Sequence, residues 1–330
     1  MHVYRDEDAD LALIRGRRVA IIGYGNQGRA QALNLRDSGV DVTIGLPEGS
    51  ASRARSEADG FDVMTAAQAS EKADVAVMLA ADELHAAIYA REVAPSLREG
   101  AALGFAHGLS ILFALIEPRR DLDVFLVAPK GPGTALRREY EQGRGLIALF
   151  AVHQDPSGSA KATALSYAPA IGSGRTGILE TSFAEECEAD LFNEQAVLWG
   201  AIPELIHAGF ETLVDAGFSP EIAYFECLTE VKLIADLIYE RGISGMREAI
   251  SNTAEFGALK GGTRIVTADT RTEMRRILRE VRGGGFVREL IADAEAGYPR
   301  LRSSRAQAAA HPIEAVAERL GALAAPGGDG

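Results

Sequence analysis

Short apolar runs alternate with helical patterns along the first half of the chain. The runs are RRVAIIG, VDVTIGL, ADVAVMLA, AALGFAHG, VFLVAP and LIALFAV, and amphipathic stretches separate most of them. Apolar runs of this length are typical of buried strands, whereas a 3.6-residue periodicity is typical of helices that pack on a sheet. The alternation predicts a Rossmann-type, doubly wound α/β fold in which helices cover a parallel sheet.

The strand pattern ends near residue 181, and long amphipathic helices take over. Ser219-Pro220 marks the start of one such helix, and Gly242 marks a stop. We therefore expect two domains, a dinucleotide-binding domain over residues 1–181 and an all-helical domain over residues 182–330. The final APGGDG should fray into solvent.

Composition and charge narrow the classes of function. The chain has 330 residues, of which 47% are hydrophobic and 25% charged, as in ordinary globular proteins. No apolar run approaches the roughly 18 residues that span a bilayer. The polar N-terminus is also unlike a leader, so we expect a cytoplasmic protein. A formal net charge of -13 argues against nucleic acid as a partner. The two cysteines, Cys187 and Cys227, are expected to be small core residues.

Gly23, Gly25 and Gly28 form the pattern G-x-G-x-x-G directly after an apolar run and at the start of a predicted helix. In this setting the pattern favours a dinucleotide site, because the glycines let a pyrophosphate approach the backbone at the helix N-terminus. The alternative is a helix start with ordinary packing glycines.

The second predicted strand bears on the choice between NAD and NADP. It ends at Gly45 and lacks the acid that usually bonds the ribose 2′-hydroxyl of NAD. The loop that follows offers hydroxyl and guanidinium groups to a 2′-phosphate, from Ser50, Ser52, Arg53 and Arg55. These groups predict NADP. NAD stays open, because the carboxylate of Glu48 would accept bonds from the free hydroxyls of NAD and repel a phosphate.

Two pairs of acids, Asp190/Glu194 and Glu226/Glu230, are each spaced four residues apart on predicted helices. Residues four apart share a helix face, and both faces otherwise carry apolar side chains typical of a core. Burying an unpaired carboxylate there is costly, and hard divalent cations such as Mg²⁺ offset that cost. The acids therefore predict a metal site. The alternatives are a solvated groove or pairing with lysines and arginines.

These features belong to segments that resemble ketol-acid reductoisomerase in its short, single-copy (class I) form. The metal-binding helices of that family are similar to ADLFNEQAVL (189–198) and AYFECLTEVKLIADLIYERGI (223–243). The resemblance covers essentially the whole chain, in order, through GYGNQGRAQALNLRDSG (23–39), FAHG (105–108), VAPKGPG (127–133), LFAVHQD (149–155), ISNTAEFG (250–257) and HPIE (311–314). It implies a knotted helical domain, which periodicity cannot reveal.

The resemblance also implies roles for individual residues. Two Mg²⁺ ions would be bound by Asp190, Glu194, Glu226 and Glu230. His107 and Lys130 would belong to the active site, and Ser251 would bind substrate. The implied cofactor residues, besides the three glycines, are Tyr24, Asn26, Gln27, Asp82, Glu83, Leu84, His85 and Gly133. Without the resemblance, a structural role is the more common explanation for a lone histidine such as His107. Lys130 is then explained as a solvated loop lysine, and Ser251 as a helix cap or surface hydroxyl.

The family's reaction has two stages on a 2-hydroxy-3-oxo acid such as 2-acetolactate or 2-aceto-2-hydroxybutyrate. An alkyl group migrates while the metals polarise the ketone and hydroxyl, and NADPH then reduces the new ketone to give a 2,3-dihydroxy acid. Glu230 and His107 are the candidates for proton handling. The implied pathway is the biosynthesis of the branched-chain amino acids valine and isoleucine. We also expect a homodimer or larger homo-oligomer in which the partner subunit supplies some ligands.

Several positions depart from the family's usual residues. Pro47 stands where an arginine commonly binds the 2′-phosphate, Asn193 replaces a glycine and Thr229 replaces a histidine. Further departures are at Ala80, Ala81 and Thr134 to Leu136. They leave open a specialised paralogue and an inactive dinucleotide sensor. A metal-free hydroxy-acid dehydrogenase with the same cofactor domain is a further alternative, but it gives no reason for the two acid pairs. Because all the implied metal, active-site and substrate residues are present, we expect an active isomeroreductase.

Overall fold

The computed structural model describes residues 2–324, so the expected fraying of APGGDG (325–330) lies outside the described residues. The chain divides into two compact units, Met1–Ala189 and Asp190–Gly330. The division falls inside one helix, α10 (Phe183–Asn193). No described helix is both long enough and apolar enough to cross a membrane.

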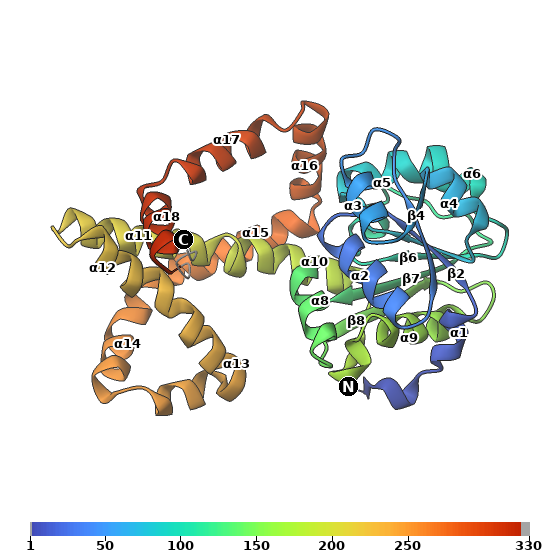
Figure 1. Ribbon diagram of the computed structural model, residues 1–330. Coiled ribbons are helices and arrows are strands. Elements are labelled where there is room, and N and C mark those ends of the chain that lie inside the picture. Colours follow the sequence, from blue (N-terminus) through green and yellow to red (C-terminus); the bar gives the residue numbers. More distant parts are fainter. Residues whose placement is uncertain (1, 325–330) are drawn as a thin grey trace, which may run out of the picture. The chain divides into compact units, whose positions relative to one another are not determined.

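A nine-stranded sheet in the order β1-β9-β8-β7-β6-β5-β2-β3-β4 forms the centre of the first unit (Figure 1). The six neighbouring strands from β7 to β4 in this order are parallel, which confirms the predicted parallel sheet. β8 instead runs antiparallel to β7, because it begins beside the end of β7, where Ala148 pairs with Pro129. The strands are β1 (Val3–Tyr4), β2 (Arg18–Ile22), β3 (Asp41–Gly45), β4 (Asp62–Met64), β5 (Val75–Met78), β6 (Ala102–Phe105), β7 (Asp123–Pro129), β8 (Ala148–Gln154) and β9 (Ile178–Glu180).

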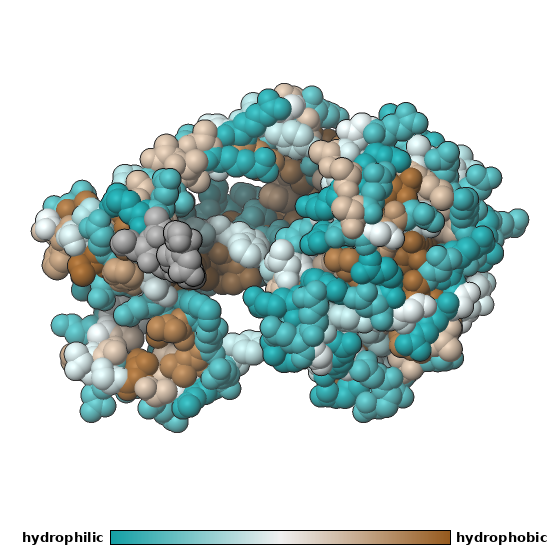
Figure 2. Space-filling model, viewed as in Figure 1, coloured by the Kyte–Doolittle hydropathy of each residue, from teal (hydrophilic) through white to brown (hydrophobic). Residues whose placement is uncertain are grey.

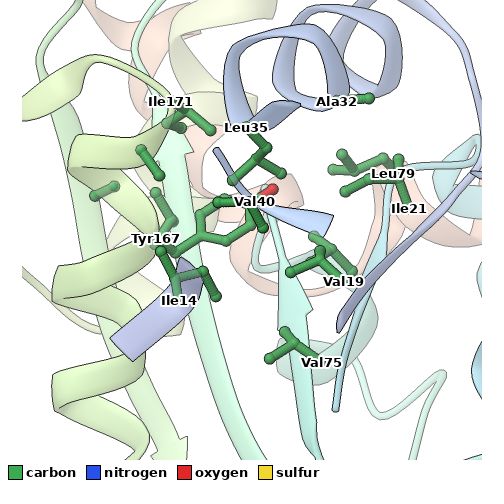
Figure 3. Close-up of a cluster of buried hydrophobic side chains, with 14 of the residues drawn as sticks. Ile14, Val19, Ile21, Ala32, Leu35, Val40, Val75, Leu79, Tyr167 and Ile171 are labelled. Carbon is green, nitrogen blue, oxygen red and sulfur yellow. The ribbon is translucent and has the colours of Figure 1, made fainter. Parts of the chain in front are cut away.

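Helices cover both faces of the sheet, which confirms the doubly wound fold. Successive strand residues point to opposite faces, so Val19 and Ile21 join one buried cluster while Ala20 and Ile22 join another. Tyr167 and Leu35 close the first cluster from their helices, as Figure 3 shows. The helices of this unit are α1 (Leu11–Arg15), α2 (Asn26–Asp37), α3 (Ser52–Ala58), α4 (Ala66–Lys72), α5 (Asp82–Ile88), α6 (Ala94–Ser96), α7 (Leu109–Leu112), α8 (Gly133–Glu141), α9 (Ala160–Ala170) and most of α10.

The described residues of the second unit are helical, as predicted. Pro220 begins a helix after Ser219, and Gly242, with a φ of 68°, kinks a helix that continues beyond it. A small core contains Phe210 and Ile313. The helices are α11 (Ala201–Asp215), α12 (Pro220–Tyr224), α13 (Glu230–Ala249), α14 (Asn252–Ile265), α15 (Ala268–Arg282), α16 (Gly285–Glu295), α17 (Pro299–Ala309) and α18 (Pro312–Ala324), with π-helical turns η4 (Glu194–Leu198) and η5 (Phe225–Thr229).

Candidate active site

The glycine pattern forms a tight turn between β2 and α2. Gly23 has a φ of 106°, and a Cβ there would lie 2.4 Å from the backbone nitrogen of Ala80. A Cβ on Gly28 would lie 2.3 Å from the carbonyl oxygen of Gly23, whereas a Cβ on Gly25 would meet nothing within 4 Å. Two of the glycines are therefore required by packing. The third, at the N-cap of α2, leaves open space above the helix N-terminus, where a pyrophosphate would bind.

Polar side chains of this turn form hydrogen bonds with the backbone of the loop after β7. The Oδ1 atom of Asn26 accepts a bond of 2.9 Å from the backbone N–H of Thr134, and Gln27 donates one of 2.9 Å to the carbonyl oxygen of Gly131. A Cβ on Gly133 would lie 2.1 Å from the carbonyl oxygen of Asn26, so only glycine fits there. The side chain of Tyr24 is buried, and its hydroxyl donates to Asp59.

The loop after β3 does not present its arginines as the sequence led us to expect. The guanidinium group of Arg53 donates to the carbonyl oxygens of Leu46 and Val63 at 3.1 and 3.2 Å. Arg55 donates to the carbonyl oxygen of Tyr24 at 2.8 Å. These groups satisfy backbone carbonyls at the ends of β3 and β4 and on the glycine turn, while Glu48 at the loop tip is exposed. Spacing alone could not distinguish a phosphate-binding arginine from one that binds its own backbone.

The same loop and the turn after β5 hold other predicted cofactor residues. The Ser50 hydroxyl accepts from the backbone N–H of Ser52, the first residue of α3. Asp82 and Glu83 occupy the first turn of α5, and Leu84 is exposed. His85, in contrast, is buried.

A buried carboxylate that sequence reasoning missed brings His107 and Lys130 together. Glu186, on α10, is 1% exposed. It accepts bonds from Lys130 Nζ at 2.8 Å, from the backbone N–H of Gly108 at 2.9 Å and from His107 Nδ1 at 3.1 Å. The other ring nitrogen of His107 lies 3.9 Å from the sulfur of Cys187. The signal was present, because Glu186 precedes Asp190 by four residues and continues the same spacing on one helix.

The charged groups of this cluster stabilise one another's ionised forms. Burial disfavours the ionised carboxylate of Glu186, but hydrogen bonds and the charges of His107 and Lys130 outweigh it and lower its pKa. Burial also disfavours the charged His107 ring, yet bonds to Cys187 and Glu186 and the Glu186 charge raise the pKa of His107 well above its ordinary value. Burial raises the pKa of the Cys187 thiol, and both cysteines are free. The cluster thus places a cationic pair around one anion at the carboxyl ends of β6 and β7.

Three of the four predicted metal ligands lie where helices change their winding, whereas Asp190 lies within α10. Glu194 begins η4, Glu226 lies within η5 and Glu230 begins α13. Such π-helical turns occur frequently at functional sites. Among the described residues of the second unit, no three acidic, histidine or cysteine side chains are close enough to hold an ion. The two pairs therefore do not converge within that unit of a single chain.

The predicted apolar stripe beside Glu226 and Glu230 is not buried within the chain, so that expectation is wrong for a single copy. Ile222, Phe225 and Leu233 are 49, 44 and 64% exposed. Amphipathic spacing predicts that these residues share one helix face, but it does not identify the surface that covers that face. The face of α10 fits the expectation better, since Cys187 and Leu191 are buried.

Ser251 is the N-cap of α14, where its hydroxyl oxygen accepts a bond of 3.2 Å from the backbone N–H of Ala254. The alternative interpretation as a helix cap is therefore correct. A role in substrate binding stays a prediction, because the hydroxyl hydrogen can still donate.

Comparison with known proteins extends over both units. Residues 13–177 match the family described as "Acetohydroxy acid isomeroreductase, NADPH-binding domain", and residues 183–325 match "Ketol-acid reductoisomerase, C-terminal domain". The structure of an NADH-preferring ketol-acid reductoisomerase from an uncultured archean is 42% identical, covers 99% of this chain and 100% of that chain, and superposes with a TM-score of 0.96.

More distant structures share only the fold. A putative oxidoreductase from Jannaschia sp. CCS1 is 15% identical, covers 81% of this chain and 97% of that chain, and has a TM-score of 0.61. A semialdehyde dehydrogenase NAD-binding protein from Cupriavidus necator is 19% identical, covers 81% of this chain and 98% of that chain, and has a TM-score of 0.58.

Proposed function

This chain belongs to the ketol-acid reductoisomerase family and is an NAD(P)-dependent oxidoreductase of branched-chain amino-acid biosynthesis; we propose that it acts in the cytoplasm on 2-acetolactate or 2-aceto-2-hydroxybutyrate. The product would be a 2,3-dihydroxy acid formed by alkyl migration and reduction. The observation that carries this proposal is the buried Glu186, which holds His107 and Lys130 one helical turn before Asp190.

We infer that the four acids hold two Mg²⁺ ions. Their donor set fits, because Asp190, Glu194, Glu226 and Glu230 offer only carboxylate oxygens, the ligands that Mg²⁺ prefers. When bound, the ions would act as Lewis acids toward the ketone and hydroxyl oxygens of the substrate.

The chain's own residues would handle charge and protons. Lys130 would stabilise negative charge on a substrate oxygen, since its ammonium group is held in place by Glu186. His107 would hold a proton on Nδ1 toward Glu186, and its Nε2 atom, which lies 3.9 Å from the sulfur of Cys187, would exchange a proton with substrate or water. Glu230, on the second unit, is the other candidate for proton exchange, and Ser251 would donate a hydrogen bond to substrate.

We propose that NADH serves this enzyme at least as well as NADPH. The support is local: Pro47 cannot pair with a phosphate, Glu48 would repel one, and Arg53 is bound to backbone carbonyls. The NADH-preferring relative is consistent with this view. Ser50 and Ser52 would then bond the ribose hydroxyls.

We propose a homodimer at least, in which a second copy covers the helical unit. Large apolar side chains are exposed on α13 and α14, including Leu233, Ile243, Phe256 and Leu259 at 62 to 65%. Brown patches over these helices are visible in Figure 2. Exposed apolar surface of this extent marks interaction sites in soluble proteins. A second copy would also supply the acids that do not converge within one chain.

The experiment that tests the function is oxidation of NADH and of NADPH in the presence of 2-acetolactate, with and without Mg²⁺. We expect turnover only with Mg²⁺. The compound 3-hydroxy-3-methyl-2-oxobutyrate, the already rearranged ketone, separates the alternatives. Reduction of this ketone without turnover of 2-acetolactate would instead indicate a simple hydroxy-acid dehydrogenase.

A further inference from the structure

His85 is almost fully buried, at 3% exposure, although it follows the turn that lines the predicted cofactor site. Its Nε2 atom lies 3.0 Å from the carbonyl oxygen of Ala80, and its Nδ1 atom lies 3.0 Å from the hydroxyl of Ser110. A carbonyl oxygen can only accept, so Nε2 must carry the proton. In the neutral ring Nδ1 therefore accepts from Ser110.

A neutral ring suits its surroundings. The charged groups near it are Asp82, whose Oδ1 lies 3.7 Å from Nδ1, Glu83 on the same helix, and His107. Burial lowers the pKa of His85 despite these two acids. A protonated ring would instead donate from Nδ1, and the Ser110 hydroxyl would have to turn its hydrogen away and accept that bond.

The carbonyl that His85 holds belongs to the wall of the glycine turn. Ala80 packs so closely on Gly23 that an added Cβ would lie 2.4 Å from its nitrogen, and the N–H of Leu79 donates to the carbonyl oxygen of Ile22. The turn after β5 and the turn after β2 therefore form one packed unit. A shift of the Ala80 carbonyl would move the surface against which a dinucleotide lies.

The other partner of His85 leads to the reacting centre. Ser110 is fully buried in α7, three residues after His107, and Gly108 between them donates to Glu186. One imidazole ring thus joins the cofactor wall to the segment that carries His107.

We propose that His85 is a positioning residue for the nicotinamide cofactor, which it does not touch: it fixes the Ala80 turn against the glycine turn and links that turn through Ser110 to the His107 segment. This replaces the expectation that His85 contacts the cofactor directly. The inference rests on the proposed cofactor site and not on the proposed rearrangement, so binding of NADH without substrate tests it separately.

The test compares variants of His85 that differ in whether they keep its hydrogen bond to the carbonyl oxygen of Ala80. His85→Gln places an amide N–H near the position of Nε2 and keeps the bond to Ala80, whereas His85→Asn is too short to reach that carbonyl. We expect the NADH dissociation constant, measured by fluorescence titration, to stay within about threefold in His85→Gln and to rise about tenfold in His85→Asn. His153→Leu, at an exposed histidine of the same unit, is the control and should bind NADH normally.

Ser110→Ala is a second, milder test, because it removes only the hydroxyl that bonds to His85 and leaves the imidazole ring in place. This variant is therefore less prone to misfold than a change at His85. It should weaken NADH binding about threefold or more, although Ser110 has no exposed surface with which to touch a cofactor. Thermal melting confirms that each variant is folded. Folded His85→Asn and Ser110→Ala proteins with unchanged NADH affinity would overturn the proposal, as would a His85→Gln protein as weak as His85→Asn. Normal NADH binding in a wild-type protein that fails to turn over 2-acetolactate would refute the proposed function alone.

Discussion

Replacing Glu186 by glutamine should disrupt both stability and turnover, because this single buried carboxylate holds two cationic side chains. The change keeps the shape of the side chain but removes its charge. Charge-assisted bonds to Lys130 and His107, at 2.8 and 3.1 Å, would be lost. Each is worth about 1.5–3 kcal/mol. The amide still offers one acceptor oxygen and no longer bears the desolvation cost of a buried charge, so the losses are partly offset.

The net loss in the free energy of unfolding is therefore about 2–4 kcal/mol. For a unit the size of residues 1–189, this corresponds to a fall of about 4–16 °C in the unfolding midpoint. The effect has a pH window. The lowered pKa of Glu186 means that its contribution is present above the ordinary carboxyl pKa and is lost in acid. The raised pKa of His107 means that its contribution is present below its ordinary pKa of about 6.5 and is lost in base.

The assay is thermal unfolding in chelator from pH 4 to pH 9, followed by kcat and KM for 2-acetolactate with Mg²⁺. We expect kcat to fall about a hundredfold or more, because Lys130 and His107 lose their orientation. Glu185→Gln is the matched control, since Glu185 is the exposed neighbour on the same helix. A Glu186→Gln protein with the melting temperature and kcat of the control would refute the role of Glu186 as the centre of the site.

Three further changes probe the metal site, the cofactor loop and the fold. Asp190→Asn or Glu226→Gln should abolish isomerisation while NADH binding, measured by fluorescence, stays within about threefold; near-normal turnover at limiting Mg²⁺ would show that these acids are not ligands. Coexpression of the two variants should restore part of the activity if each site takes acids from both subunits. Pro47→Arg with Glu48→Ala should shift the kcat/KM ratio toward NADPH by about ten- to a hundredfold, and an unchanged ratio would mean that the loop does not reach the adenosine ribose. A hydrogen bond from an arginine lowers the pKa of Asp121 to about 2, so Asp121→Asn should cost about 1 kcal/mol in urea unfolding at pH 6, and this difference should shrink as the pH falls below 4.

The central strands could be predicted from the sequence because they are buried on both faces. β2, β5 and β7 are almost continuous apolar runs of four to seven residues. Runs of this length and composition are typical of strands that are buried on both faces of a parallel sheet. The edge strands β1 and β4, and β9 beside β1, are only two or three residues long and carry no such pattern. The direction of β8 depends on where the chain re-enters the sheet, which composition does not encode.

The candidate site was predictable where function follows from residue type and spacing. Gly23 and Gly28 cannot be replaced by a larger residue without a clash with the backbone. His107 and Lys130 both bond to Glu186. Orientation was not predictable. Arg53 turns inward to backbone carbonyls, and His85 is buried with Nε2 against the carbonyl oxygen of Ala80. In both cases a partner is a backbone carbonyl only five to seven residues earlier in the chain, and residue type and spacing do not reveal which way the side chain turns.

The position of the methyl groups in the product tests the central claim most directly. Proton NMR of the product formed from 2-acetolactate, Mg²⁺ and NADH distinguishes rearrangement followed by reduction from reduction alone. Migration of the methyl group gives 2,3-dihydroxy-3-methylbutanoate, whose methyl groups share one carbon and appear as two singlets. We predict these singlets. Reduction without migration gives 2,3-dihydroxy-2-methylbutanoate, and its methyl doublet would contradict the account.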